Sequence, residues 1–283
     1  MTELGANHYG KETIRLVKVD KSSARHEVRD LTVDIVLAGD FGASYEAGDN
    51  TLVIATDTMK NTVYAFAPEH LTGPIEPFGL TLGRRFLESP QVDTATVSLR
   101  EHAWERLDGA GGPAPDAFRR LASGTRIATV AASRTGLVIE SGVTDLTVMK
   151  TGRSAFTGFP RDRYTTLPET GDRIMATKVT ATWRHAGETK DWDASHAGIL
   201  ATLLEAFADH DSESVQHSIW VVGSAMLDRH PEIDEVRMSM PNLHHWAVDL
   251  APFGGDNRGE IFVATVDPHG MIEATVRRGI SAP

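Results

Sequence analysis

Strict alternation of apolar side chains is the feature that most constrains how this chain folds. Within residues 28–38, apolar side chains alternate strictly at Leu31, Val33, Ile35 and Leu37. Because successive side chains of a strand point to opposite faces, this run predicts a strand with one buried and one solvated face. Such strands are typical of antiparallel sheets that are covered on one side. The run therefore favours a sheet with a second layer packed against it.

Helical periodicity supplies that second layer in both halves of the chain. Apolar residues recur every three or four positions at Leu71, Ile75, Phe78, Leu82 and Phe86, with Pro74 near the start. They recur in the same way at Ile199, Leu200, Leu203, Leu204 and Phe207. This spacing predicts helices with one apolar face. A further helix is expected from a Ser214 cap to a stop before Pro231.

The remaining strand-like runs complete a plan that both halves share. They cover residues 12–20, 51–55, 92–106 and 118–132, and then 137–150, 174–185, 234–240, 243–250 and 260–266. The length of 283 residues suits two domains of about 150 residues each. We therefore expect an α+β fold with antiparallel sheets and helices packed on one face. The predicted domains are residues 1–136 and 137–283, and the long aperiodic stretch 151–172 is of the kind that is often functional.

Composition excludes several classes of function. The 28 Lys and Arg against 39 Asp and Glu give a net charge of −11, which disfavours a broad nucleic-acid or anionic-membrane surface. The absence of cysteine excludes thiol catalysis, iron–sulfur clusters and thiolate zinc. No His-Glu-x-x-His motif occurs, so no metal site is expected, and Gly109–Gly112 is better explained as a hairpin tip than as a phosphate loop. No targeting or membrane segment is visible, so a cytoplasmic location is expected.

Three polar clusters are more informative. In Asn242-Leu243-His244-His245-Trp246, strand alternation would place Asn242, His244 and Trp246 on one face and Leu243 and His245 on the other. Only one of the two histidines could then enter a pocket together with Asn242. From this segment alone, a His–Asn pair hydrogen-bonded at a sheet edge is the simpler interpretation.

The other two clusters lie at predicted helix starts. Val215 and Gln216 follow the Ser214 cap, where backbone N–H groups lack helical acceptors and the helix dipole favours negative charge. Such a site, with an amide side chain beside it, suits a planar anion. Residues 54–58 place Thr56, Asp57 and a further threonine where an apolar run enters a helix. Taken singly, a plain helix start and ordinary capping explain most of these groups.

Six separated segments of the chain, two of which include residues of these clusters, resemble the uricase (urate oxidase) family. The segments are Tyr9–Lys11, Ala55–Tyr64, Phe156–Asp162, Tyr164–Leu167, Asp172–Ile174 and Ser239–His244. The resemblance covers nearly the whole chain and implies two tandem tunnelling-fold (T-fold) domains in a homotetramer with a central, tunnel-shaped barrel. It also implies oxidation of urate by O2, without a metal or organic cofactor, to 5-hydroxyisourate and H2O2.

The resemblance also assigns residues to roles. Lys11 and Thr56 match the catalytic Lys–Thr pair of the family, and His244 matches its catalytic histidine. The substrate contacts match Thr56, Asp57, Phe156, Arg173, Val215, Gln216 and Asn242. Each active site is implied to be shared between two chains. Leu243 departs from the family pattern, in which lysine is frequent.

The chemistry of these side chains agrees with the assignment, and two alternatives stay open. A guanidinium fork and an amide suit the edges of the flat urate anion, while Lys, Thr and His can pass protons. A pteridine-type T-fold enzyme would need zinc, which the absent Cys and the absent His-x-His triplet disfavour. A purine-binding protein without catalysis would need the gripping residues but not Lys11, Thr56 and His244 together.

Overall fold

The structure is a computed structural model that describes residues 2–189, 191–265 and 267–279. The chain divides into two compact units, each with its own core. The first comprises Met1–Gly142 and Arg184–His196, and the second comprises Val143–Trp183 and Ala197–Pro283. Both units combine antiparallel strands with helices, which confirms the predicted α+β class. The domain boundary expected between residues 136 and 137 stays a prediction.

The first unit is built on antiparallel strands in the order β1-β2-β3-β6. These strands are β1 (Tyr9–Asp20), β2 (Glu27–Gly39), β3 (Val92–Glu101) and β6 (Thr125–Ser133). The alternating side chains of β2, Leu31, Val33, Ile35 and Leu37, are all fully buried. The period-2 pattern thus decided which face of the strand forms the core.

Two helices cover that face, and a short helix α1 (Gly42–Glu46) precedes them. Side chains of α2 (Thr56–His70) and α3 (Ile75–Leu87) share one buried cluster with those of β2 and β3. Pro74 is the N-cap of α3, as predicted. At Gly79 of α3, a Cβ atom would lie 2.7 Å from the side chain of Leu99, so only glycine permits this close approach of helix and sheet.

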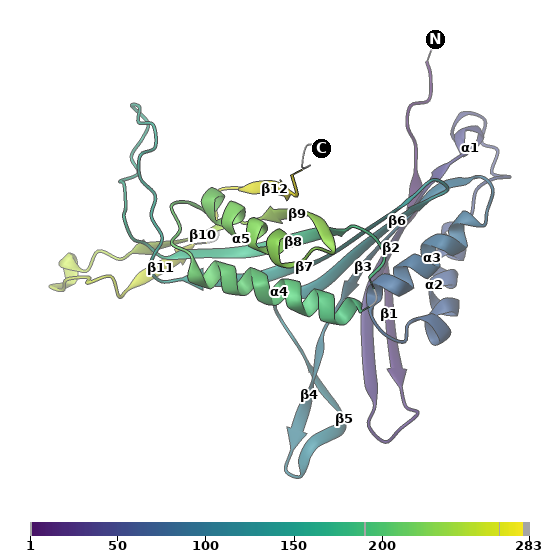
Figure 1. Ribbon diagram of the computed structural model, residues 1–283, viewed down its shortest axis with the longest axis horizontal. Helices are drawn as coiled ribbons and strands as arrows, with labels where there is room; N and C mark the ends of the chain where they lie inside the picture. Colours follow the sequence, from purple (N-terminus) through teal and green to yellow (C-terminus); the bar gives the residue numbers. More distant parts are fainter. Residues whose placement is uncertain (1, 190, 266, 280–283) are drawn as a thin grey trace. The chain divides into compact units, whose positions relative to one another are not determined.

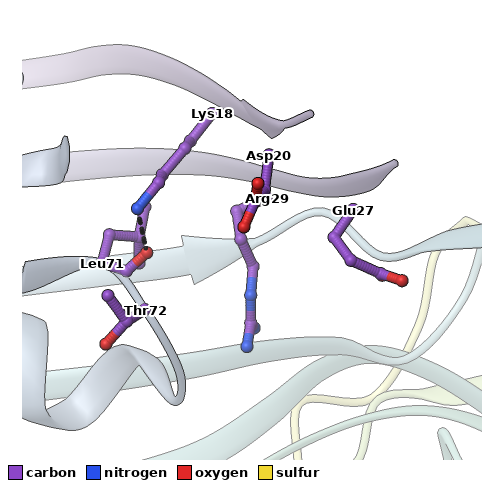
Figure 2. A pocket seen from close by; sticks show the side chains of 6 residues that line it. All are labelled: Lys18, Asp20, Glu27, Arg29, Leu71 and Thr72. Carbon is purple, nitrogen blue, oxygen red and sulfur yellow. Dashed lines mark hydrogen bonds between the residues drawn. The ribbon is translucent and has the colours of Figure 1, made fainter. Parts of the chain in front are cut away.

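A lysine from the sheet terminates α2. The ammonium group of Lys18 on β1 donates hydrogen bonds to the carbonyls of Ala67 (3.2 Å), Pro68 (2.9 Å) and Leu71 (2.9 Å), and Figure 2 shows this side chain reaching Leu71. Ala67 C=O also accepts the N–H of Leu71, and the lysine gives the carbonyls at the end of the helix a charged donor. A cavity of about 240 Å³ lies beside it. Its cationic side chains are already engaged, since Arg29 pairs with Glu101.

Two sequence expectations in this unit were wrong. Residues 51–55 form no strand; the hydroxyl of Tyr9 instead accepts from the N–H of Ile54 (2.8 Å) and donates to its carbonyl (3.1 Å), which replaces sheet pairing. The runs 92–106 and 118–132 are not single strands, because β4 (Trp104–Gly109) and β5 (Gly112–Arg120) form a separate two-stranded hairpin between β3 and β6. Prolines are tolerated there because every strand of a hairpin has a free edge. Gly109 and Gly112 pair at its tip, as expected.

The second unit repeats the plan with different connections. Its strands are the later part of β7 (Leu137–Lys150), most of β8 (Met175–His185), β9 (Ile233–Ser239), β10 (Asn242–Ala247), β11 (Phe262–Thr265) and β12 (Glu273–Arg277). β8 pairs with β9 and β10, β9 with β12, and β10 with β11. β12 was not predicted, since only one of its five residues is buried. A 3-10 helix, η1 (Ala251–Phe253), lies between β10 and β11.

Helices α4 (Trp192–Asp209) and α5 (Val215–Arg229) contribute to the core of this unit. Ser214 is the N-cap of α5, as predicted, and its side chain accepts from the N–H of His217. Gly223 of α5 plays the part that Gly79 plays in α3, because a Cβ there would lie 2.7 Å from Val276 of β12. In both units a glycine therefore sets the distance between helix and sheet.

Candidate active site

A cavity of about 540 Å³ in the second unit holds several of the predicted site residues. Its wall includes Arg173, which lies two residues before β8. It also includes Asn242 and His244 on β10. β10 pairs with β8 so that Asn242 lies opposite Thr177. Sheet register thus brings side chains from distant parts of the chain to one cavity.

Arg173 has an unusual environment for an arginine. Its guanidinium lies over the ring of Phe156, with the central carbon 5.2 Å from the ring centre. Among the described residues, no acceptor takes a hydrogen bond from this guanidinium, and its Nε atom is fully buried. Burial lowers the pKa of Arg173 from its ordinary value. A half-buried cation without a carboxylate partner is costly, so this group is suited to an anionic ligand.

The backbone around Phe156 fixes that pair. The N–H of Arg173 donates to the carbonyl of Ser154 at 2.8 Å. Phe156 and Thr170 exchange two backbone hydrogen bonds of 2.8 and 3.1 Å. Backbone hydrogen bonds therefore hold the aperiodic stretch 151–172, which was predicted to be functional, in place next to both Phe156 and Arg173.

The same segment lies beside the start of α5. Ser154 and Ser212 form a parallel bridge, in which Ala155 N–H donates to Ser212 C=O (2.7 Å) and Ser212 N–H donates to Arg153 C=O (2.9 Å). Because the two segments run parallel, the residues that follow them, Phe156 and Ser214, advance in the same direction. The bridge thus connects the Arg173–Phe156 pair to the N-terminus of α5.

Val215 and Gln216 form the first turn of that helix. The side chain of Val215 is buried and that of Gln216 is exposed. Within the described part of the chain, their backbone N–H groups have no hydrogen-bond acceptor, whereas His217 N–H is taken by Ser214 Oγ at 3.1 Å. Free N–H groups at a helix N-terminus favour an anion. This agrees with the predicted role of the pair.

His244 is held from both sides along its strand. The amide of Asn242 donates to His244 Nδ1 at 3.3 Å, and the ring of Trp246 stacks on that of His244 with centres 5.2 Å apart. These contacts confirm that Asn242, His244 and Trp246 share one face. Burial, followed by the positive charges of Arg173 and His269, lowers the pKa of His244, so the imidazole is neutral near pH 7.

His245 differs from the expectation in one respect. Its Nδ1 donates to the carbonyl of Leu243 at 2.9 Å, and it pairs with Ala264 of β11. Nevertheless His245 also borders the cavity, as does Ala247. The cavity therefore extends around the strand rather than being confined to the face that carries His244.

The remaining predicted residues, Lys11, Thr56 and Asp57, belong to the first unit. Lys11 lies near the start of β1, and Thr56 and Asp57 open α2, whose N-cap is Ala55. Asp57 forms an ion pair with Lys60 and accepts a hydrogen bond from Asn61 at 2.9 Å. The hydrogen bond and charge of Lys60 lower the pKa of Asp57, and the charge of Lys11 adds to this. Lys11 is thus near enough to Asp57 to act on it.

Several residues that shape the site gave no sequence signal. Ser154, Thr170 and Ser212 act through backbone pairing over long separations along the chain, which no local pattern reveals. His269 lowers the pKa of His244 from a loop that had no predicted element. Tyr9 belongs to one of the family motifs, but that motif does not predict that its hydroxyl bonds the backbone of Ile54.

Metal ligation has no obvious location in the part of the chain that is described. Across residues 2–189, 191–265 and 267–279, no group of three or more His, Cys, Asp or Glu side chains could hold a metal ion. Over the same residues, no helix is long and apolar enough to cross a bilayer.

Comparison with known proteins assigns the chain to a family. The family model for uricase matches residues 7–131 and 139–273. The chain is 46% identical to the uricase of Arthrobacter globiformis over 97% of its own length and 90% of that protein, and 34% identical to the uricase of Dictyostelium discoideum over 99% of both chains. The crystal structure of the Arthrobacter uricase superposes with a TM-score of 0.94 at 45% identity, covering 100% of this chain and 97% of that one. A urate oxidase variant from Bacillus sp. TB-90, at 22% identity and a TM-score of 0.83 over 97% of this chain and all of its own, shares the fold. With the uricase model matching both halves and a relative 46% identical over nearly its whole length, the chain belongs to the uricase family.

Proposed function

We propose that this chain is a urate oxidase, an oxidoreductase that uses O2 as electron acceptor. Urate, O2 and water would give 5-hydroxyisourate and H2O2, with two electrons passing from the purine to oxygen. The observation that carries the proposal is Arg173, a half-buried guanidinium that lies over Phe156 and has no acid partner among the described residues. The uricases to which the chain is similar support the same reaction.

The second unit would bind the substrate. Phe156 would stack on the flat purine, and Arg173 would donate two parallel hydrogen bonds to its anionic edge. The N–H of Val215 and the side-chain amide of Gln216 would complete that edge, since an amide both donates and accepts, as a lactam requires. Asn242 would lie over the ring where O2 reacts.

Lys11, Thr56 and His244 would move protons. Electron-rich urate can reduce O2 directly, so the protein needs to remove and return protons rather than to supply a redox centre. His244 is suited to accept a proton because it is neutral near pH 7. Lys11 and Thr56 would pass protons on the other side of the substrate, and Asp57 would contact it. We propose that no metal or organic cofactor takes part.

The assembly that we propose is a homotetramer whose T-fold domains, residues 1–136 and 137–283, build a tunnel. Each site would combine Lys11, Thr56 and Asp57 of one chain with the gripping residues of another. Urate and O2 are the proposed partners, with neither nucleic acid nor membrane, and the proposed location is the cytoplasm. The net charge of −11 agrees with the absence of a nucleic-acid surface.

The proposal is tested by mixing purified, exhaustively chelated protein with urate and following urate absorbance, O2 uptake and H2O2. We expect urate loss, O2 uptake and peroxide in equal amounts, at a rate that added metals do not change. Binding of urate without O2 uptake would instead support the non-catalytic purine-binding alternative. A folded, inactive protein that copper, iron or zinc activates would contradict the cofactor-independent mechanism.

A further inference from the structure

Three polar side chains form a buried chain beneath the start of α5. His210, between α4 and α5, has its Nε2 atom 2.8 Å from Ser218 Oγ. Ser218 Oγ is in turn 2.8 Å from Ser212 Oγ. Ser212 and Ser218 are 2% and 0% exposed. Neither the proposed proton relay nor the proposed substrate contacts include these groups.

The hydrogen-bond partners set the direction of this chain. His210 Nδ1 lies 2.8 Å from the carbonyl of Ala206, which can only accept, so Nδ1 carries the proton. Burial lowers the pKa of His210, which keeps the ring neutral and leaves Nε2 as an acceptor. Ser218 therefore donates to His210 and accepts from Ser212. The carbonyl of Ser214 is an alternative acceptor for both hydroxyls, but it is more distant, at 3.2 Å from Ser218 Oγ and 3.0 Å from Ser212 Oγ.

The hydrogen-bonded series ends at Ser212, which connects the Arg173–Phe156 pair to the start of α5. Ser212 bridges to Ser154, and its backbone bonds to Ala155 and Arg153 flank that bridge. Ser154 accepts the N–H of Arg173. A displacement of Ser212 would therefore move Arg173 relative to the N–H groups of Val215 and Gln216.

The near end is fixed by two cations. Lys150 donates to the carbonyl of His210, and Arg153 donates to the carbonyl of Asp209 at 3.0 Å. These bonds satisfy carbonyls at the end of α4, as Lys18 does for α2. His210 is thus anchored through its backbone, so its ring can hold Ser218 in a defined place.

We propose that His210 is a positioning residue for purine binding: through Ser218 and Ser212 it sets the spacing between Arg173 and the first N–H groups of α5. The inference rests on the proposed function, because it assumes that these groups grip urate. His210 itself would touch neither substrate nor O2. Its loss should weaken binding and leave the chemical step nearly unchanged.

The test compares His210→Leu, His210→Gln and Ser218→Ala with the unaltered protein. We expect His210→Leu and Ser218→Ala to raise KM for urate, and Kd for a non-oxidisable purine analogue, by about tenfold with little change in kcat. His210→Gln should restore most of the affinity, because its side-chain oxygen can accept from Ser218. Ser218→Ala removes a single atom, which keeps the test available if His210→Leu does not fold.

The chain offers a matched control at the other end of α5. His230 Nε2 and Thr202 Oγ1 form a hydroxyl–imidazole bond of the same length, 2.8 Å, with no connection to Ser212 among the described contacts. Thr202→Val and His230→Leu should lower thermal stability but leave KM and Kd unchanged. Equal shifts in KM for the control and test variants would overturn the proposal, as would an unchanged KM in His210→Leu and Ser218→Ala.

The two proposals fail in different ways. If the unaltered protein binds the purine analogue but consumes no O2 with urate, the oxidase assignment fails, and the Kd comparison still decides the role of His210. If the unaltered protein oxidises urate while His210→Leu keeps its KM and Kd, only the positioning role fails.

Discussion

The proposed site residues of the first unit and those of the second unit are held in place in different ways. Arg173 and His244 are partly buried, and each is oriented by contacts with an aromatic ring. Lys11 and Thr56 lie where a strand and a helix begin, and no described residue takes a hydrogen bond from the Lys11 ammonium group. The residues of the second unit are therefore held by packing against aromatic rings, whereas Lys11 and Thr56 of the first unit depend on local backbone geometry.

That local geometry includes an irregularity next to Lys11. The pairing of β1 with β2 shifts between Lys11 and Ile14, which marks a β-bulge. Thr13 within it has a φ of 55°, and its N–H donates to Asp34 Oδ1 at 2.6 Å. A β-branched residue in this region is strained, and bulges often re-aim side chains beside active sites. The bulge thus gives Lys11 a defined direction without burying it.

The largest effect should come from Lys11→Met. If Lys11 moves a proton, kcat should fall by about 10²–10⁴-fold, while Kd for a purine analogue changes much less. Steady-state rates and analogue binding measure the two quantities. Lys18→Met is the matched control on the same strand: it should reduce stability, because Lys18 bonds three carbonyls at the end of α2, but not kcat. If Lys11→Met weakened analogue binding by as large a factor as it lowered kcat, Lys11 could not be assigned to proton transfer rather than to binding.

Arg173→Ala should act on binding first. A charge-assisted hydrogen bond to a buried ion contributes about 1.5–3 kcal/mol, so Kd for the analogue should rise by about 10- to 150-fold. Calorimetric titration measures this directly. Arg106→Ala is the control. The Arg106 guanidinium also lies over a phenylalanine ring, 4.6 Å from the centre of Phe118, but it donates hydrogen bonds to backbone carbonyls. A Kd for Arg173→Ala equal to that of the control would contradict the proposed grip.

Refolding two inactive variants together tests whether the groups meet across chains. Lys11→Met and Arg173→Ala chains, denatured and refolded in a one-to-one mixture, should pair at random. Half the pairs would then be mixed, and one of their two sites would carry neither lesion, so about a quarter of wild-type activity should return. Mixed oligomers, identified by mass spectrometry, that stay as inactive as their parents would place each site within one chain.

The smallest effect is expected for His245→Ala. His244 contacts the side chains of Asn242 and Trp246, whereas within the described part of the chain the ring of His245 bonds to the carbonyl of Leu243 on its own strand. We therefore expect kcat for His245→Ala to remain within a few-fold of wild type, far above that for His244→Ala. Rates of both folded variants decide the matter. If His245→Ala lowered kcat more than His244→Ala did, the substrate would bind at the face of β10 that carries His245.

Local patterns predicted the elements whose signal repeats along the chain. The alternation in β2 and the three-to-four spacing in α3 each placed the correct face in the core. The run 51–55 was misassigned because apolar content without alternation does not distinguish a strand from a covered loop. There the phenol of Tyr9 supplied the backbone partners that a sheet would have given. β12 was missed because one buried residue, Val276, carries no period.

The amino-acid sequence by itself determined the α+β class, the buried faces and, through motifs in order, the uricase family, because these depend on residue type and on spacing over a few residues. The meeting of Arg173 with Phe156, and of Ser154 with Ser212, depends instead on residues far apart along the chain. Such contacts form only when sheet register and loop closure bring distant backbone groups within 3 Å, and no local periodicity encodes that distance. The geometry of the proposed grip, including the buried His210–Ser218–Ser212 chain, is therefore a property of the folded unit.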